Sequence, residues 1–215
     1  MEGIRAITHG AFVYMKYILA TKEHMTQIFD EDGVVHVGTV LKAGPVTVTQ
    51  VKTTEKDGYQ AVQVGYGFKR PALVTKPMKG HLKELGSFRY LREFPVTEGA
   101  EVGQTTDVSA FAAGDKVVVA GISKGKGFQG VVKRHGFHGG PRTHGQKHSE
   151  REPGSIGGGL RTRVPKGMRM AGRMGSDRVS VKGLKVLHVD PKTNTIIISG
   201  AVPGRRGTLI EITAQ

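Results

Sequence analysis

The stretch KVVVAGISKGKGFQG, residues 116–130, changes character at residue 123. Its first half is a run of β-branched and small apolar residues, which is typical of a buried strand. Its second half intersperses glycine with lysine and shows no apolar periodicity. Strand patterns return only at residues 179–181 and 184–189. We therefore predict a β domain that is interrupted by a long insertion and completed by the strands that follow it.

The insertion, residues 123–174, has the composition of a polyanion-binding segment. It holds 12 lysines and arginines against two acids, a net charge of +10, and 13 of the 32 glycines. Only 11 of its 52 residues are apolar, too few to offset the entropy lost when a chain becomes ordered. A loop of this length inside a compact domain needs a ligand to order it. We expect the insertion to be disordered until RNA binds it.

The rest of the chain carries only +4 and has the pattern of short β-strands separated by turns. The hairpin signal Asp57-Gly58 lies between two of these strands. A single helix is predicted at residues 77–85, with Gly86 just after its end. Many short strands favour a mainly β fold, a small closed or nearly closed barrel. The predicted strands are residues 17–21, 25–29, 34–41, 47–52, 59–64, 116–122, 179–181, 184–189, 195–199 and 208–212, with weaker ones at Val96, Val102 and 108–111.

Composition also narrows the partner and the compartment. The 215 residues carry 32 basic and 18 acidic side chains, a net charge of +14 that favours a polyanionic partner. The absence of cysteine excludes disulfides and indicates a reducing compartment such as the cytosol. The apolar runs are too short to span a membrane, and Glu2 argues against a signal peptide. Nucleic acid is therefore preferred over a membrane.

The string GKGFQG, residues 125–130, matches the dinucleotide-binding fingerprint and, with Val132, the kinase glycine loop. We interpret the match as chance, because VVKRHG at 131–136 does not read as the start of a helix and no partner motif follows. Glycines here let the backbone pass close to phosphates. No Ser/His/Asp group or paired carboxylates stand out, so no small-molecule substrate, cofactor or enzyme activity is predicted.

Four histidines, at positions 135, 138, 144 and 148, raise the hypothesis of a metal site. Their neighbours are glycine, lysine and arginine, a cationic setting that opposes a divalent ion. We favour contact of these rings with RNA bases and phosphates, and predict no bound metal. We interpret Met168, Met170 and Met174 as apolar anchors where the insertion rejoins the barrel.

Several ordered motifs resemble large-subunit ribosomal protein three, a universal family, in its bacterial form. They are MTQIFDEDG (25–33), SKGKGFQGVVKR (123–134), THG (143–145), PGSIG (153–157), MAGRMG (170–175) and GAVPG (200–204). The resemblance implies a translation-protein-type barrel with a long glycine-rich basic extension. It also implies direct binding to large-subunit rRNA early in assembly, neighbouring ribosomal proteins as partners, and an extension directed towards the peptidyl-transferase centre of cytoplasmic ribosomes.

The resemblance and the charge pattern together select the candidate rRNA-binding residues. By resemblance, the first four basic residues lie at the root of the extension, the next group lies along it, and residues 153–159 form or approach its tip. The later basic residues lie within a stretch without acids, between Glu152 and Asp177, which favours phosphate contact over a solvated charged face. The full set is Lys124, Lys126, Lys133, Arg134, His135, Arg142, His144, Lys147, Arg151, Ser155, Arg161, Arg163, Lys166, Arg169 and Arg173.

The chain departs from the family pattern at named positions. Glu150 places an acid where the family often has histidine, in the RNA-facing stretch. Gly158 stands where some bacterial members carry a modifiable glutamine, so this modification is not expected here. Spacing near residues 160–165 also differs. We divide the chain into a tail at 1–14, a barrel domain at 15–122 and 175–215, and the extension at 123–174; translation from Met15 would omit the tail. A free-standing RNA or DNA binder stays the alternative function.

Overall fold

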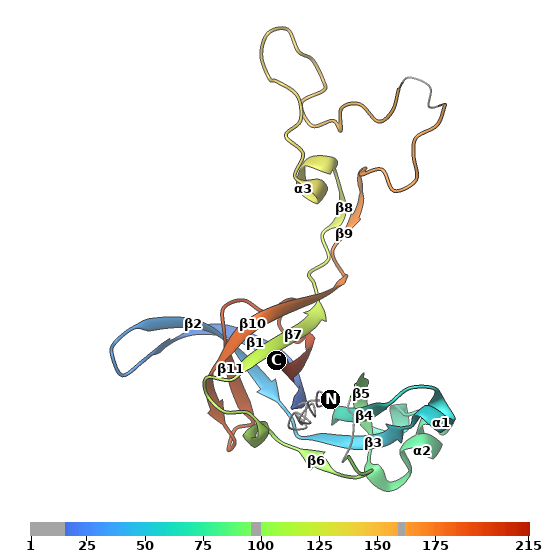
Figure 1. The fold of residues 1–215 in the computed structure, drawn as a ribbon, viewed down its shortest axis with the longest axis vertical. Helices are drawn as coiled ribbons and strands as arrows, with labels where there is room; N and C mark the ends of the chain where they lie inside the picture. Colours follow the sequence, from blue (N-terminus) through green and yellow to red (C-terminus); the bar gives the residue numbers. More distant parts are fainter. Residues whose placement is uncertain (1–15, 96–99, 159–161) are drawn as a thin grey trace, which may run out of the picture.

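Six antiparallel strands of the computed structural model close into a barrel (Figure 1). The structure describes residues 16–95, 100–158 and 162–215. Around the barrel the strand order is β1-β12-β7-β10-β11-β2. The strands are β1 (Tyr17–Phe29), β2 (Val35–Ala43), β7 (Lys116–Ile122), β10 (Arg178–Asp190), β11 (Thr195–Ser199) and β12 (Leu209–Ala214).

The last strand, β12, lies between β1 and β7 and pairs with both. Ile212 lies opposite Ile18 of β1 and opposite Val119 of β7, and all three side chains are fully buried. Burying a side chain of this size contributes about 1.5–3 kcal/mol. Alternate residues on neighbouring strands thus fill the barrel interior, as the period-two pattern predicts.

A second antiparallel sheet, in the order β5-β4-β3-β6, packs against the barrel. Val62 and Phe94 of this sheet belong to the same buried cluster as the barrel residues. The ring of Phe94 stacks on Tyr17 of β1 with 4.9 Å between centroids. The strands between the barrel elements therefore form a sheet of their own rather than part of the barrel wall. They are β3 (Val46–Lys52), β4 (Ala61–Phe68), β5 (Phe88–Phe94) and β6 (Thr105–Thr106).

The predicted helix at 77–85 is confirmed as α2 (Lys76–Leu82) followed by the 3-10 turn η2 (Lys83–Leu85). The hairpin predicted at Asp57-Gly58 is confirmed, because β3 and β4 pair antiparallel on either side of it. The single-turn helix α1 (Thr54–Asp57) connects β3 to β4, and Gly58 ends it at a φ of +80°. The four residues of α1 are enough to reverse the chain between β3 and β4.

Three weak strand predictions have different outcomes. Residues 108–110 form the 3-10 turn η3 (Val108–Ala110), and Val102 lies in a turn. Val96 lies outside the described residues. A further 3-10 turn, η1 (Pro71–Leu73), precedes α2.

Two pairs of predicted strands are single bulged strands. Residues 179–181 and 184–189 both belong to β10, whose register shifts between Val181 and Leu184, beside Gly183 at a φ of +73°. Residues 17–21 and 25–29 both belong to β1, which shifts between Lys22 and Met25. Bulges bend a strand without ending it. The prediction of a mainly β fold is confirmed.

A long arm leaves the barrel between β7 and β10 and extends far beyond it (Figure 1). Its stem is the two-stranded ribbon β8 (Gly127–Gln129) and β9 (Gly172–Met174), and a short helix, α3 (Val131–His135), follows β8. The other described residues of the arm between α3 and β9, 136–158 and 162–171, form loops. Within the described part of the chain, no helix has the length and apolar character needed to cross a membrane.

Candidate nucleic-acid interface

Backbone hydrogen bonds hold the two strands of the arm together at its root. The Ser123 amide donates to the Asp177 carbonyl oxygen at 2.9 Å, and the Lys126 amide donates to the Met174 carbonyl oxygen at 2.9 Å. The Asp177 amide donates to the Ser123 hydroxyl at 3.2 Å. These backbone amides therefore donate within the root of the arm, whereas the side chains of Lys124 and Lys126 are exposed to solvent.

The root also requires one particular glycine. Gly175 has a φ of +80°, and a Cβ atom there would lie 2.1 Å from the Lys124 carbonyl oxygen. Only glycine tolerates both the left-handed backbone and this close approach of the opposite strand. The glycine excess noted in the sequence therefore has a packing cause at this position.

A neck above the stem ties the outgoing and returning chains together through one acceptor. The Arg134 Nη1 atom donates to the Met170 carbonyl oxygen at 2.7 Å, and the His135 ring lies 3.0 Å from the same oxygen. Gly172 makes room for the guanidinium, since a Cβ atom there would lie 2.5 Å from Arg134 Nη1. Arg134 and His135 are half-buried as a result.

The prediction that residues 131–136 do not start a helix is wrong. Residues 131–135 form α3, which ends at Gly136 with a φ of +73°. The β-branched Val131 and Val132 have low helix propensity, so the sequence pattern concealed this turn. Tertiary contact with Met170 accounts for it. The glycine string 125–130 therefore contains the three-residue strand β8 and is followed by α3, which has only five residues.

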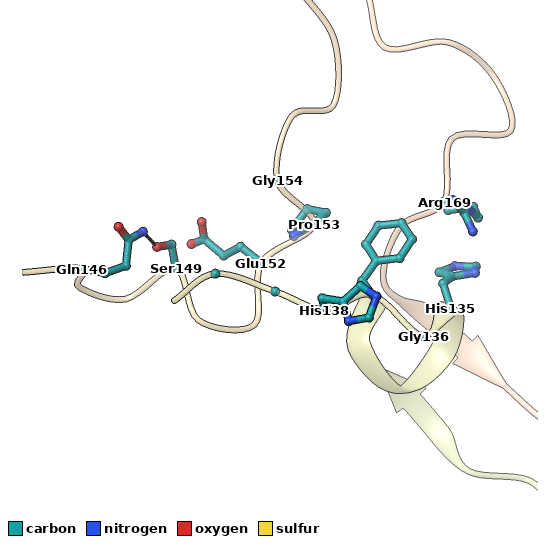
Figure 2. Close-up of a pocket in the computed structure, with 12 residues that line it drawn as sticks. His135, Gly136, His138, Gln146, Ser149, Glu152, Pro153, Gly154 and Arg169 are labelled. Atoms are coloured by element: carbon teal, nitrogen blue, oxygen red, sulfur yellow. Dashed lines mark hydrogen bonds between the residues drawn. The ribbon is translucent and has the colours of Figure 1, made fainter. Parts of the chain in front are cut away.

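An aromatic cluster lies on the far side of the neck. The Arg169 guanidinium stands 4.8 Å from the centre of the Phe137 ring, and the Phe137 and His135 rings are 5.9 Å apart. These groups border an open hollow of about 550 Å³ that Glu152 and other loop residues line from the opposite side (Figure 2). A cation over an aromatic face contributes about 0.5–1 kcal/mol at an exposed site.

The distal loop pairs the unexpected acid with a cation. Glu150 forms an ion pair with Arg142, and the Glu150 carbonyl oxygen accepts the Gly140 amide at 3.1 Å. Gly139 approaches the same oxygen so closely that a Cβ atom would lie 2.0 Å from it. Glu150 thus closes the loop on itself, and its charge is offset by a neighbouring arginine.

The structure spreads the predicted site residues along the whole arm. Arg134 and His135 are half-buried at the neck, and Arg161 lies outside the described residues. Arg173 donates to the backbone carbonyls of Gly175 and Ser176 at 3.3 and 3.2 Å. The other predicted residues are exposed: Lys124, Lys126, Lys133, Arg142, His144, Lys147, Arg151, Ser155, Arg163, Lys166 and Arg169, as is Arg173 itself.

Two residues near the root escaped the sequence analysis. Lys22 of β1 donates to the Gly204 carbonyl oxygen at 3.1 Å and lines a hollow with Lys124 and Lys126. Burial and repulsion by Lys124 lower the pKa of Lys22. Phe128 is 76% exposed on the stem, opposite Arg173. Lys22 is 102 positions from Lys124 in the sequence, so its place beside the arm follows only from the closed barrel. Phe128 could have been found from the sequence, because it is an aromatic residue among basic ones.

The histidines and methionines have separate positions in the arm. His135 contacts Met170, whereas His144 and His148 lie in the exposed distal loop. Across residues 16–95, 100–158 and 162–215, no three His, Asp or Glu side chains gather as metal ligands would. The prediction that all three methionines anchor the arm on the barrel is wrong. Met174 does line the hollow beside the barrel, but Met170 lies at α3 and Met168 is exposed.

A family model described as ribosomal protein L3 matches residues 93–196. A curated relative, the large ribosomal subunit protein uL3 of Herpetosiphon aurantiacus, is 50% identical over 199 residues. That alignment covers 91% of this chain and 94% of the relative.

Proposed function

Because the chain belongs to the ribosomal protein L3 family, we propose that its arm, residues 123–174, binds large-subunit rRNA directly. The protein is a structural constituent of the large ribosomal subunit. The β domain, residues 15–122 and 175–215, carries the arm and leaves it projecting (Figure 1). Its place of action is then the ribosome in the cytoplasm.

The observation that carries this proposal is the exposure of the arm's charge. Nearly all of the described cations in the arm face solvent, and one of its two acids, Glu150, is paired with Arg142. Phosphate contacts by lysine and arginine release counterions, which supplies a large share of the affinity of proteins for nucleic acids. A solvated surface would mix charges of both signs instead.

The contacts divide the candidate residues into two roles. Arg134 and His135 hold the returning chain at Met170, so we assign them to positioning the arm. The exposed lysines at the root and the neck, Lys124, Lys126 and Lys133, are assigned to phosphate contact. Phe128, exposed opposite Arg173, is placed to stack on an unpaired base.

We further propose that the protein binds early in assembly and that its arm extends towards the peptidyl-transferase centre. The support is the family resemblance together with the length of the arm beyond the barrel. A photoreactive group at Ile156, an exposed residue of the distal loops, tests this placement in assembled subunits. Crosslinks to rRNA outside the peptidyl-transferase region would contradict it.

The salt dependence of rRNA binding tests the phosphate contacts. Replacing Lys124, Lys126 and Lys133 by glutamine is expected to lower the slope of log K against log salt by about 2–3. The matched control replaces three exposed lysines of the second sheet region, Lys56, Lys76 and Lys79. Equal slopes for both variants would contradict the assignment, and failure to co-sediment with large subunits would favour a free-standing RNA binder.

A further inference from the structure

Beyond the barrel wall, β1 and β2 continue as a two-stranded hairpin, residues 23–39, which we call the outer hairpin (Figure 1). Its register pairs Phe29 with Val35 and Gln27 with Val37. Residues directly opposite each other in an antiparallel pair project from the same face. Met25, two residues before Gln27, projects from this face as well.

This face of the outer hairpin is apolar and exposed. Met25, Phe29, Val35 and Val37 are 50%, 65%, 47% and 48% exposed. Single exposed apolar residues are ordinary, but several that share one face of a ribbon mark an interaction surface. Thr39 lies on the same face of β2 but is buried in the barrel. The apolar face of the outer hairpin is therefore the continuation of the face that points into the barrel interior.

The outer hairpin is held in shape by its own turn. The Gly33 amide donates to the Asp30 carbonyl oxygen at 2.9 Å, and the Asp30 amide donates to the Val34 carbonyl oxygen at 3.0 Å. The His36 ring lies 2.5 Å from an Asp30 carboxylate oxygen. A surface that is already ordered loses less entropy when a partner binds.

Charge decides which partner this surface accepts. Residues 23–39 contain four acids and no lysine or arginine, a net charge of −4 in a chain of +14. Three of the acids, Asp30, Glu31 and Asp32, follow one another at the tip. Phosphate would be repelled there, so the surface does not suit RNA. Apolar side chains rimmed by acids are complementary to a protein surface that presents apolar side chains among lysines and arginines.

We propose that the outer hairpin is a docking surface for a basic protein of the large ribosomal subunit. The contact is made by the Met25, Phe29, Val35 and Val37 face, and the acidic tip pairs with cations of the partner. This inference rests on the proposed function, because it seeks the partner within the large subunit. It gives the protein two surfaces of opposite charge, one for RNA and one for protein.

Site-specific photocrosslinking in assembled subunits tests the proposal. Phe29→p-benzoylphenylalanine places the probe on the apolar face, and the same substitution at Phe128 places it on the arm. Both rings are exposed, so neither substitution disturbs a core. The expected result is a crosslink from position 29 to one basic protein and a crosslink from position 128 to rRNA.

A charge-reversal pair supplies the second measurement. Glu31→Lys with Asp32→Lys is expected to lower the crosslink yield from position 29 at least fivefold. Glu55→Lys with Glu84→Lys makes the same charge change at exposed sites of the second sheet region and is expected to leave that yield unchanged. Equal yields for the two variants would overturn the charge complementarity on which the proposal depends.

The possible outcomes separate this inference from the proposed function. Crosslinks from position 29 to rRNA, to a second copy of the chain or to nothing, with position 128 still reaching rRNA, overturn the docking surface alone. A protein crosslink from position 29 without an rRNA crosslink from position 128 supports the docking surface and contradicts the RNA-binding arm. Absence of the chain from large subunits overturns both.

Discussion

The guanidinium of Arg134 donates a 2.7 Å hydrogen bond to the carbonyl oxygen of Met170, 36 residues later in the chain. This bond joins the outgoing and returning chains of the arm just above the stem. Its donor comes from a helix that the sequence pattern did not predict. We therefore expect Arg134 to affect RNA binding through the shape of the arm.

Substitution of Arg134 by lysine separates shape from charge. Arg134→Lys keeps the charge but lacks the rigid planar donor, so we expect about a fivefold loss of affinity for large-subunit rRNA, equivalent to about 1 kcal/mol. Arg70→Lys makes the same replacement at an exposed position outside the arm and is expected to change the dissociation constant less than twofold. Equal losses for both variants would contradict the positioning role.

Two glycines of the loop before β12 provide a matched test of barrel packing. Gly204 and Gly207 have φ angles of +90° and +82°, but only a Cβ at Gly204 meets neighbours, 2.8 Å from the Ile122 carbonyl oxygen and 2.7 Å from Thr208. We expect Gly207→Ala to lower the free energy of unfolding by about 1 kcal/mol and Gly204→Ala by about 2 kcal/mol more. Urea unfolding measures both, and equal losses would show that backbone conformation alone matters.

Stability in acid depends on a polar network on the second sheet. Glu93 Oε1 lies 2.8 Å from Lys52 Nζ, and the Tyr59 hydroxyl donates to Glu93 Oε2 at 2.8 Å. The hydrogen bond from Lys52, aided by that from Tyr59, lowers the pKa of Glu93 below its usual value of 4.5. A lowered folded-state pKa gives stability that is full above the unfolded value and is lost as pH falls through the folded value.

Glu93→Gln should therefore be less stable than the wild type at pH 7 by under about 1 kcal/mol, since the network is partly exposed. The difference should disappear below the lowered pKa of Glu93. Thermal unfolding between pH 7 and pH 2.5 measures this, with Glu84→Gln at an exposed position as the control. A difference that stays constant across this range would contradict the network's role.

Hydrogen exchange distinguishes the arm from the barrel. In the isolated protein we expect amides of residues 133–169 to exchange rapidly, because the arm buries too little apolar surface to offset its ordering entropy. Amides of β7 and β12 should be strongly protected, since each of these strands is hydrogen-bonded to a strand on both sides. Addition of large-subunit rRNA should slow exchange in the arm. Strong protection of 133–169 without RNA would contradict the prediction.

Most of the strands could be predicted from local sequence patterns, because apolar side chains that alternate along a strand, such as Ile196 and Ile198, are the ones that become buried. These patterns failed where the backbone departs from regular geometry. Gly183 bends β10 without ending it, and α3 packs against the returning chain through the hydrogen bond from Arg134 to Met170. The division of strands between the barrel and the second sheet depends on long-range pairing, which period-two alternation does not encode.

The candidate site divides in the same way. Charge clustering identified the exposed cations of the arm, since few apolar residues accompany them. The position of Lys22 beside Lys124 could not be predicted from local patterns, because only the closed barrel brings the two lysines to the same hollow. Nor did local patterns distinguish Arg134, which binds backbone, from the exposed Lys133 next to it.

The place of β12 between β1 and β7 also sets the order of events during synthesis. The barrel closes only after residues 209–214 have been made, more than thirty positions after the arm. Because unpaired strand edges persist until a long-range partner arrives, the nascent chain presents its basic arm before it has a complete core. We therefore expect unassembled copies to be prone to capture by any polyanion present, and prompt pairing with rRNA to protect them from aggregation.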